Sequence, residues 1–348
     1  MSFFKLSGLL QDFFARRQAW LVAGLLLAAS GFTANGQTSA SNQRAVLLNV
    51  VAADSAGNPV PDLKTSEFAV FDNGSPGQIA SVRLNQSDKP GPLVVLFDLM
   101  NSGESSRGVV WNAVKTSLAH FPSTGPLYLY LLVEDGSLYP VHALPGAPVA
   151  QAAVDASWVK DIGPLMDAAM QKVSQVRPVD FRAVSGSLSS RASLTATYRA
   201  LDDMRALMAA LHGPKGLLWV TYGIPSTIHL ADRTWLDGVP FLRQMGARFV
   251  RSETTVYTAD PGISLQAGIL NRDSLDILTG TTGGRVFSTI DLNRAIAQIE
   301  ADARTNYSLD YQPPAKNWDG KYHKLRVTVA RKGVRLQTEL GYYAVSGS

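Results

Sequence analysis

Residues 92–105 read PLVVLFDLMNSGES, and no other segment of the chain indicates the fold as clearly. Its apolar run from Leu93 to Phe97 has no polar interruption, which is typical of a parallel strand that helices cover on both faces. The run ends on Asp98, and a small polar loop follows. Ligands of open α/β sheets bind at the carboxyl ends of the strands, so Asp98 is the first candidate for a functional residue.

Strand and helix patterns alternate between residues 91 and 304. Apolar residues at helical spacing predict a long helix from Leu194 to Leu211, and Asp291 is placed to cap another helix. This alternation predicts an α/β domain that is doubly wound and Rossmann-like, with a mostly parallel sheet, flanking helices and right-handed crossovers. Segment 134–193 has no regular pattern. Further strands are expected at 127–133, 217–220, 254–258 and 285–287.

The two flanks of this domain have short alternating strands and strong turns instead. The N-terminal β segment is residues 37–90, and the C-terminal segment, residues 305–348, contains alternating runs at 324–330 and 334–343. The turn Arg331-Lys332-Gly333 between those runs predicts a β-hairpin. Because a lone hairpin is marginal in water, we expect it to pair with the N-terminal segment. The α/β domain is then inserted in a small β-sandwich-like domain built from both chain ends.

The first 36 residues have the pattern of a secretory signal peptide. Three basic residues precede an apolar run at 20–29, and small residues follow it at 34–36. The run is shorter than the roughly 20 residues that a membrane-spanning helix needs. We therefore expect residues 1–36 to be removed on export, which leaves no stable membrane span and a secreted or periplasmic protein. An uncleaved N-terminal anchor is the alternative.

Composition and motifs exclude several kinds of chemistry. The chain has no cysteine, so it has no disulfide, no thiolate zinc site and no cysteine nucleophile. Its net charge of +4 falls to +2 without residues 1–36, which carry three basic residues and one acidic residue. That charge is too mild to indicate nucleic-acid binding. Neither the H-E-x-x-H pattern of zinc peptidases nor the G-x-S-x-G pattern of α/β-hydrolases occurs, so we expect a protein that is not an enzyme.

Three stretches together resemble a known family. The strand, Asp98 and the loop after it resemble the opening of a von Willebrand factor A-type (VWA) domain. The segment VVAADSAGNPVPDLKTSEFAVFDNGSPGQI (50–79) and the segment LTGTTGGRVF (278–287) resemble secreted bacterial VWFA-related proteins. The resemblance covers roughly residues 45–345. It implies an α/β domain that binds a protein or cell-surface partner at the carboxyl edge of its sheet.

The same resemblance implies a degenerate metal-ion-dependent adhesion site. In VWA domains this site begins D-x-S-x-S. Asp98 and Ser102 match that motif, but Met100 replaces the first serine, and a thioether is a poor ligand for Mg²⁺. The threonine of the second motif stands six residues before a helix leucine, which here assigns it to Thr195. Tyr222 stands where the acid of the third motif is expected.

Two interpretations of Asp98 follow. With Ser102 and Thr195 it could bind Mg²⁺ or another divalent cation weakly, since such ions want several oxygen ligands and carboxylate charge. Alternatively, Asp98 caps the following loop by accepting backbone N–H groups and has a structural role. The partner-binding loop candidates are Asn101, Ser105 and Tyr222.

The sequence therefore predicts an exported, non-catalytic protein-interaction module of the adhesion or scaffold type, with a degenerate metal site. Two other functions stay open. One is an exported hydrolase whose site lies unrecognised in segment 134–193. The other is a purely structural envelope protein with no ligand at the sheet edge.

Overall fold

The computed structural model describes residues 45–101, 104–119, 125–145, 162–174, 186–229, 235–260, 267–288 and 291–345. The signal peptide predicted for residues 1–36 lies outside these ranges, as do Ser102 and much of segment 134–193. Among the helices described, none is long and apolar enough to span a membrane.

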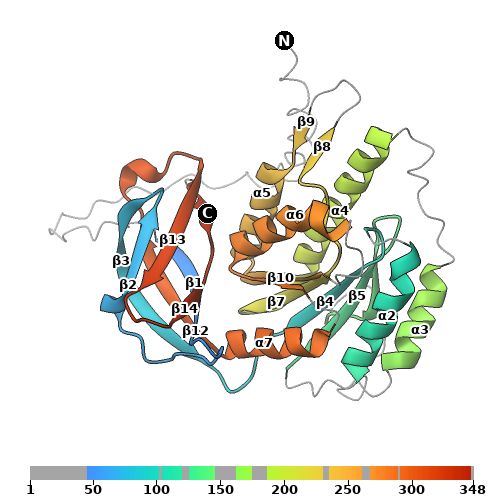
Figure 1. The fold of residues 1–348 in the computed structure, drawn as a ribbon, viewed down its shortest axis with the longest axis horizontal. Coiled ribbons are helices and arrows are strands. Elements are labelled where there is room, and N and C mark those ends of the chain that lie inside the picture. The colour runs from blue at the N-terminus through green and yellow to red at the C-terminus, as the bar shows by residue number, and fades with distance from the viewer. Residues whose placement is uncertain are drawn as a thin grey trace, which may run out of the picture. The chain divides into compact units, whose positions relative to one another are not determined.

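The α/β part of the chain is built on a six-stranded sheet with the strand order β11-β10-β7-β4-β5-β6 (Figure 1). Five strands run parallel, as predicted, and β6 pairs antiparallel with β5, so the sheet is mixed. Sequence reasoning missed β6, because it is a short edge strand that returns through a tight turn at Gly136, where φ is +84°. The strands are β4 (Leu93–Asp98), β5 (Leu127–Leu132), β6 (Leu138–His142), β7 (Lys215–Val220), β10 (Thr254–Asp260) and β11 (Val286–Ser288).

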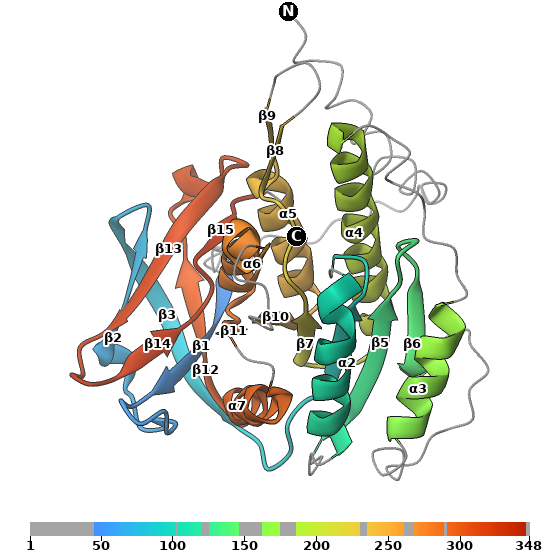
Figure 2. The same cartoon turned by 45° about the vertical axis from the view of Figure 1, so that its right-hand side comes forward.

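Helices cover both faces of this sheet, which makes three layers (Figure 2). Side chains of a strand alternate between the faces. Val95 and Phe97 therefore pack with α2 (Glu104–Ala119), α3 (Ile162–Val173) and α7 (Leu292–Arg304). Val94 and Leu96 pack with helices on the opposite face, which are α4 (Gly186–Met208), α5 (Val239–Arg251) and α6 (Ala267–Thr282). The predicted cap is present at α7, where the Asp291 side chain accepts the backbone N–H of Asn293 at 3.1 Å.

Strands from both ends of the chain form a second sheet, which has seven strands in the order β14-β1-β12-β3-β2-β13-β15. Each assigned pairing between neighbours in it is antiparallel. Its strands are β1 (Val46–Ala53), β2 (Phe68–Asp72), β3 (Ser75–Gln86), β12 (Thr305–Gln312), β13 (Tyr322–Val329), β14 (Arg335–Gln337) and β15 (Gly341–Tyr343). One-turn 3-10 helices occur at η1 (Thr65–Glu67) and η3 (Ala315–Asn317), and a separate hairpin joins β8 (Thr227–His229) to β9 (Trp235–Asp237).

This seven-stranded sheet is curled, and that corrects two predictions. Its opposite edges, β14 and β15, are joined by residues 338–340 alone, and the four Cα steps from Gln337 to Gly341 reach at most about 14 Å. The edges must therefore approach each other, so a single curled sheet replaces the expected sandwich. The predicted hairpin through Arg331-Lys332-Gly333 is also wrong, because β14 leaves that turn to pair with β1, whereas β13 pairs with β2 and β15.

The inside of the curl is a hydrophobic core. Every second residue of its strands points inward, as in β12, where Tyr307, Leu309 and Tyr311 are buried and the residues between them are half-buried. These side chains pack with Leu48 and Val50 of β1. The alternation explains why the sequence indicated β structure here, while the partners of each strand depend on long-range contacts.

Candidate functional site

Asp98 is the last residue of β4, at the carboxyl edge of the six-stranded sheet. Its side chain lies on the face covered by α4, α5 and α6, where it contacts Trp219 of β7, and it is completely buried. A buried carboxylate costs free energy unless hydrogen bonds compensate it. The donors around Asp98 therefore decide what this residue does.

The Asp98 carboxylate accepts hydrogen bonds from four donors. One oxygen accepts the backbone N–H of Asn101 at 2.8 Å. The other accepts the Asn101 side-chain amide at 2.8 Å, Trp219 Nε1 at 3.1 Å and the Thr221 hydroxyl at 2.8 Å. A carboxylate has about four acceptor positions, so these donors leave little capacity for a cation. The contacts join the loop after β4 to β7, as the capping interpretation of Asp98 requires.

Burial and hydrogen bonding act on the pKa of Asp98 in opposite directions. Removal from water raises the pKa, because it disfavours the charged form. The donors from Asn101, Thr221 and Trp219 lower it, and burial outweighs them. No cationic side chain is among these partners.

A threonine of α4 also contacts the Asp98 loop, but it is Thr197 and not the predicted Thr195. Thr195 is on the exposed side of the helix, whereas Thr197 is completely buried. The Thr197 hydroxyl accepts the Asn101 side-chain amide at 3.1 Å and lies 3.8 Å from the sulfur of Met100. Helical phase could have identified Thr197, because positions 194, 197, 198 and 201 lie on one face of a helix.

The side chain of Tyr222, which was predicted as a partner-binding loop residue, points into the protein interior. Its side chain is 2% exposed and packs on the face of α2, α3 and α7, together with Val220. Thr221, one residue earlier, points to the other face and reaches Asp98. Alternation along the chain therefore excludes Tyr222 from the space around Asp98. Its buried hydroxyl has no hydrogen-bond partner among the residues described.

The other predicted residues divide into two groups. Asn101 is half-buried and uses its side chain to hold Asp98 and Thr197, so its first role is to order the loop. Ser102 and the side chain of Ser105 lie outside what the structure describes. Across the described ranges there is no group of three or more His, Cys, Asp or Glu residues arranged to hold a metal ion.

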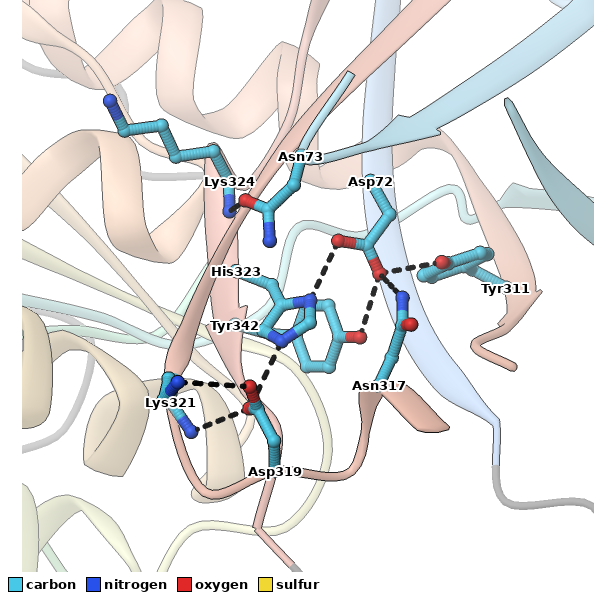
Figure 3. Close-up of polar contacts among 9 residues, drawn as sticks. All are labelled: Asp72, Asn73, Tyr311, Asn317, Asp319, Lys321, His323, Lys324 and Tyr342. Carbon is cyan, nitrogen blue, oxygen red and sulfur yellow. Dashed lines mark hydrogen bonds and ion pairs between the residues drawn. The ribbon is translucent and has the colours of Figure 1, made fainter. Parts of the chain in front are cut away.

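A second buried polar cluster lies in the seven-stranded sheet and was not predicted (Figure 3). At its centre is Asp72, which is 3% exposed and ends β2. One carboxylate oxygen accepts hydrogen bonds from Tyr311 at 2.7 Å, Asn317 at 2.8 Å and Tyr342 at 2.9 Å. The other lies 2.8 Å from Nδ1 of His323. The cluster therefore joins β2, β12, β13 and β15 at one end of the curl.

Both ring nitrogens of His323 lie within hydrogen-bond distance of a carboxylate. Nδ1 faces Asp72, and Nε2 lies 3.1 Å from Asp319, in the turn before β13. Burial raises the pKa of Asp72, but the hydrogen bonds from Tyr311, Asn317, His323 and Tyr342 together outweigh burial and hold the pKa below its ordinary value. Asp72 is thus stabilised in its charged form inside the protein.

Comparisons with known proteins give only distant likenesses. No family model and no curated protein matches the sequence. Proximal thread matrix protein 1 from the mussel byssus is 9% identical over 67% of this chain and 50% of that chain, with a TM-score of 0.35. The chain thus spans half the length of the mussel protein.

Two further solved structures have similarly low sequence identities and TM-scores. Manganese-loaded TRAP protein from Plasmodium vivax is 8% identical over 76% of this chain and 99% of that chain, with a TM-score of 0.36. The ArnB paralog VWA2 from Sulfolobus acidocaldarius is 9% identical over 85% of this chain and 75% of that chain, with a TM-score of 0.32. Likenesses this distant do not indicate the function of this chain, whose own structure shows an α/β fold.

Proposed function

We propose that this chain is an exported, non-catalytic protein-interaction module of the VWFA-related kind. Its partner-binding surface is formed by the loops at the carboxyl edge of the six-stranded sheet. The observation that carries the proposal is the buried Asp98 carboxylate, which ends the central strand β4 and joins the following loop to β7 through four hydrogen bonds.

This arrangement favours binding because it orders a loop before a partner arrives. A loop that is already fixed loses less conformational entropy on association than a mobile one. Asn101 contributes most to that order, since its backbone and its side chain both donate to Asp98 while the side chain also reaches Thr197. The loop therefore presents its outer residues from a rigid base.

The same contacts make binding independent of a metal ion. A divalent cation needs several free oxygen ligands, and the oxygens of Asp98 are already occupied by protein donors. Met100 adds a sulfur near the Thr197 hydroxyl, where an oxygen ligand would be required. The residues present do not fit Mg²⁺, so Asp98 is a structural replacement for the metal-bound aspartate of an adhesion site.

Metal independence can be tested on the chain that starts at residue 37. We would titrate it with Mg²⁺, Mn²⁺ and Ca²⁺ by calorimetry, beside an Asp98→Asn variant. The expected result is no saturable heat up to millimolar metal for either protein. Saturable binding that disappears in Asp98→Asn would contradict the structural role assigned to this carboxylate.

The interaction surface can be tested by site-specific photocrosslinking in cells that export the chain. The crosslinking residue is introduced at one of two positions. One is Val109 of α2, which is 55% exposed, and the other is Trp235 of the β8–β9 hairpin, which is 67% exposed. Leu47 on the seven-stranded sheet, also 55% exposed, is the matched control. We expect one discrete protein adduct from Val109 or Trp235, with and without EDTA. An adduct from Leu47 alone, or one abolished by EDTA, would refute the proposed surface.

A further inference from the structure

The link between β14 and β15 lies against the six-stranded part of the chain. The Gln337 side-chain amide donates to the backbone oxygen of Gly283 at 2.7 Å. The backbone N–H of Leu340 donates to the oxygen of Gly280 at 2.7 Å, and its own oxygen accepts the N–H of Leu325. Gly280 belongs to α6 of the α/β domain, and Leu325 belongs to β13 of the curled sheet. Residues 338–340 therefore contact both parts of the chain, and we call this contact the seam.

Glu339 occupies the middle of this seam and is 6% exposed. Its carboxylate accepts the backbone N–H of Asn49 at 3.1 and 3.3 Å from the two oxygens, and the Thr338 hydroxyl at 2.9 Å. The backbone N–H of Glu339 also donates to this carboxylate, and all three donors are neutral. No ion pair to Glu339 occurs within the described part of the chain, so its charge has no cationic partner there.

Among the described residues, no cationic side chain acts on the pKa of Glu339. Directly after α6 it faces Gly283, where an added Cβ would lie 3.5 Å from Oε1. Tyr257 of β10 is buried nearby, and the negative charges of Asp302 and Glu339 contribute to raising its pKa, after burial itself. Arg285, a cation that also acts on Tyr257, pairs with Asp302 at 2.7 Å. Burial raises the pKa of Glu339 to about 7, with smaller opposing effects from its hydrogen bonds.

We propose that Glu339 is a pH-sensitive latch between the curled sheet and the α/β domain. In its neutral form the side chain fits the seam with only neutral partners. Once ionised, it carries a buried charge that water stabilises better than the seam does, since the protein supplies no cation.

Release requires little movement. Leu340, the next residue, is 57% exposed, so the chain already reaches the protein surface directly after Glu339. An outward shift of residues 338–340 would break the Leu340–Gly280 and Asn49–Glu339 hydrogen bonds, while the rest of both sheets keeps its pairing. The latch therefore changes the coupling of the two parts of the chain without unfolding either one.

Hydrogen exchange measures this opening directly. Exchange of the segment 336–343 would be followed at pH 5.5 and pH 8.5 and corrected for the intrinsic rates at each pH. We expect protection to fall at least tenfold at the higher pH in the wild-type chain. Glu339→Gln should keep the same protection at both values, because a neutral amide preserves the shape and removes the charge.

Controls separate this latch from general effects of pH. Glu253→Gln removes an exposed glutamate and should behave as wild type. Strand β4 should keep its protection throughout. Equal protection of the wild-type segment at both pH values, or an equal loss in Glu339→Gln, would overturn the proposal.

A second measurement does not depend on how the variant folds. In the wild-type chain, the side-chain carboxyl carbon of Glu339 can be titrated by NMR. We expect a midpoint near the raised pKa of about 7. A midpoint below 5 would overturn the latch, because the group would then be ionised throughout the range in which the seam is closed.

Discussion

Replacement of Asp72 by asparagine should destabilise the curled sheet strongly. Asp72 is nearly completely buried. Its two carboxylate oxygens accept hydrogen bonds from four side chains, which are Tyr311, Asn317, Tyr342 and His323. Asparagine has the same shape but only one acceptor oxygen, and its amide is a donor. If the asparagine oxygen keeps its hydrogen bonds from Tyr311, Asn317 and Tyr342, the asparagine NH₂ group faces His323. The hydrogen bond between His323 Nδ1 and the carboxylate is then lost.

The size of the effect follows from the number of contacts. A hydrogen bond to a charged group contributes about 1.5–3 kcal/mol, against roughly 1 kcal/mol for a neutral one. Loss of the contact with His323 therefore costs about 2 kcal/mol, and weakening of the other three adds about 2 kcal/mol. The sum of these two contributions is about 4 kcal/mol.

Urea unfolding of the wild type and of Asp72→Asn would measure this difference, with circular dichroism and tryptophan fluorescence followed together to test for a two-state transition. The pKa of Asp72 is lowered in the folded protein, so its contribution is present above the ordinary value of 3.8 and is lost as pH falls through the folded value. The difference in free energy of unfolding between the wild type and Asp72→Asn should be constant from pH 5 to 8. It should become smaller below pH 4.

Tyr342→Phe is the matched control, since it removes one donor and leaves the charge. It should cost about 1–2 kcal/mol, a fraction of the effect of Asp72→Asn. A difference below 1 kcal/mol for Asp72→Asn at pH 7 would refute the reasoning. A difference in free energy of unfolding that becomes larger at lower pH would refute it too, because the stabilising form of Asp72 would then not be the carboxylate.

Three further changes have defined outcomes. Trp219→Phe removes one donor to the Asp98 carboxylate and should lower the free energy of unfolding by about 1–2 kcal/mol; a neutral result would mean that this contact contributes nothing. Gly284→Ala should abolish soluble expression, because its Cβ would collide with the Val256 backbone oxygen, and a normal melting temperature would contradict this. Glu339→Gln should be more stable than wild type at pH 8.5 by at most about 3 kcal/mol and equal to it near pH 4. The sign follows because a pKa raised from 4.5 to about 7 makes wild-type stability fall as pH rises between those values; a wild type that gains stability there would contradict it.

The sequence was most informative where a strand is buried on both faces. The run from Leu93 to Phe97 is apolar throughout because helices lie on either side of β4, and no competing structure fits that pattern. The cap of α7 was equally local, since Asp291 bonds to an N–H two residues away. Such features depend on neighbours in the chain and could be predicted.

Features that depend on distant contacts could not. The turn at Gly333 gives a hairpin signal, but the next strand pairs with β1, almost 300 positions earlier in the chain. The Asp72 cluster unites side chains from position 72 to Tyr342, and no spacing in the sequence relates them. At Asp98 the sequence located the carboxylate correctly but not its donors, since Trp219 and Thr221 come from the neighbouring strand.

Three buried carboxylates in this chain have different electrostatic environments, and the difference assigns them different roles. Asp72 has four donors that include His323, and its pKa is lowered, so it is a fixed charge that holds the curled sheet. Among the described residues, Asp98 accepts hydrogen bonds from the neutral donors Asn101, Trp219 and Thr221, and burial raises its pKa, which suits a buried anchor for the loop. Glu339 has neutral donors among the described residues, and burial raises its pKa to about 7, so its charge changes near neutral pH. Burial raises the pKa of all three groups, and only at Asp72 do the hydrogen bonds outweigh it, so the balance between burial and donors separates the fixed charge from the group that can release the seam.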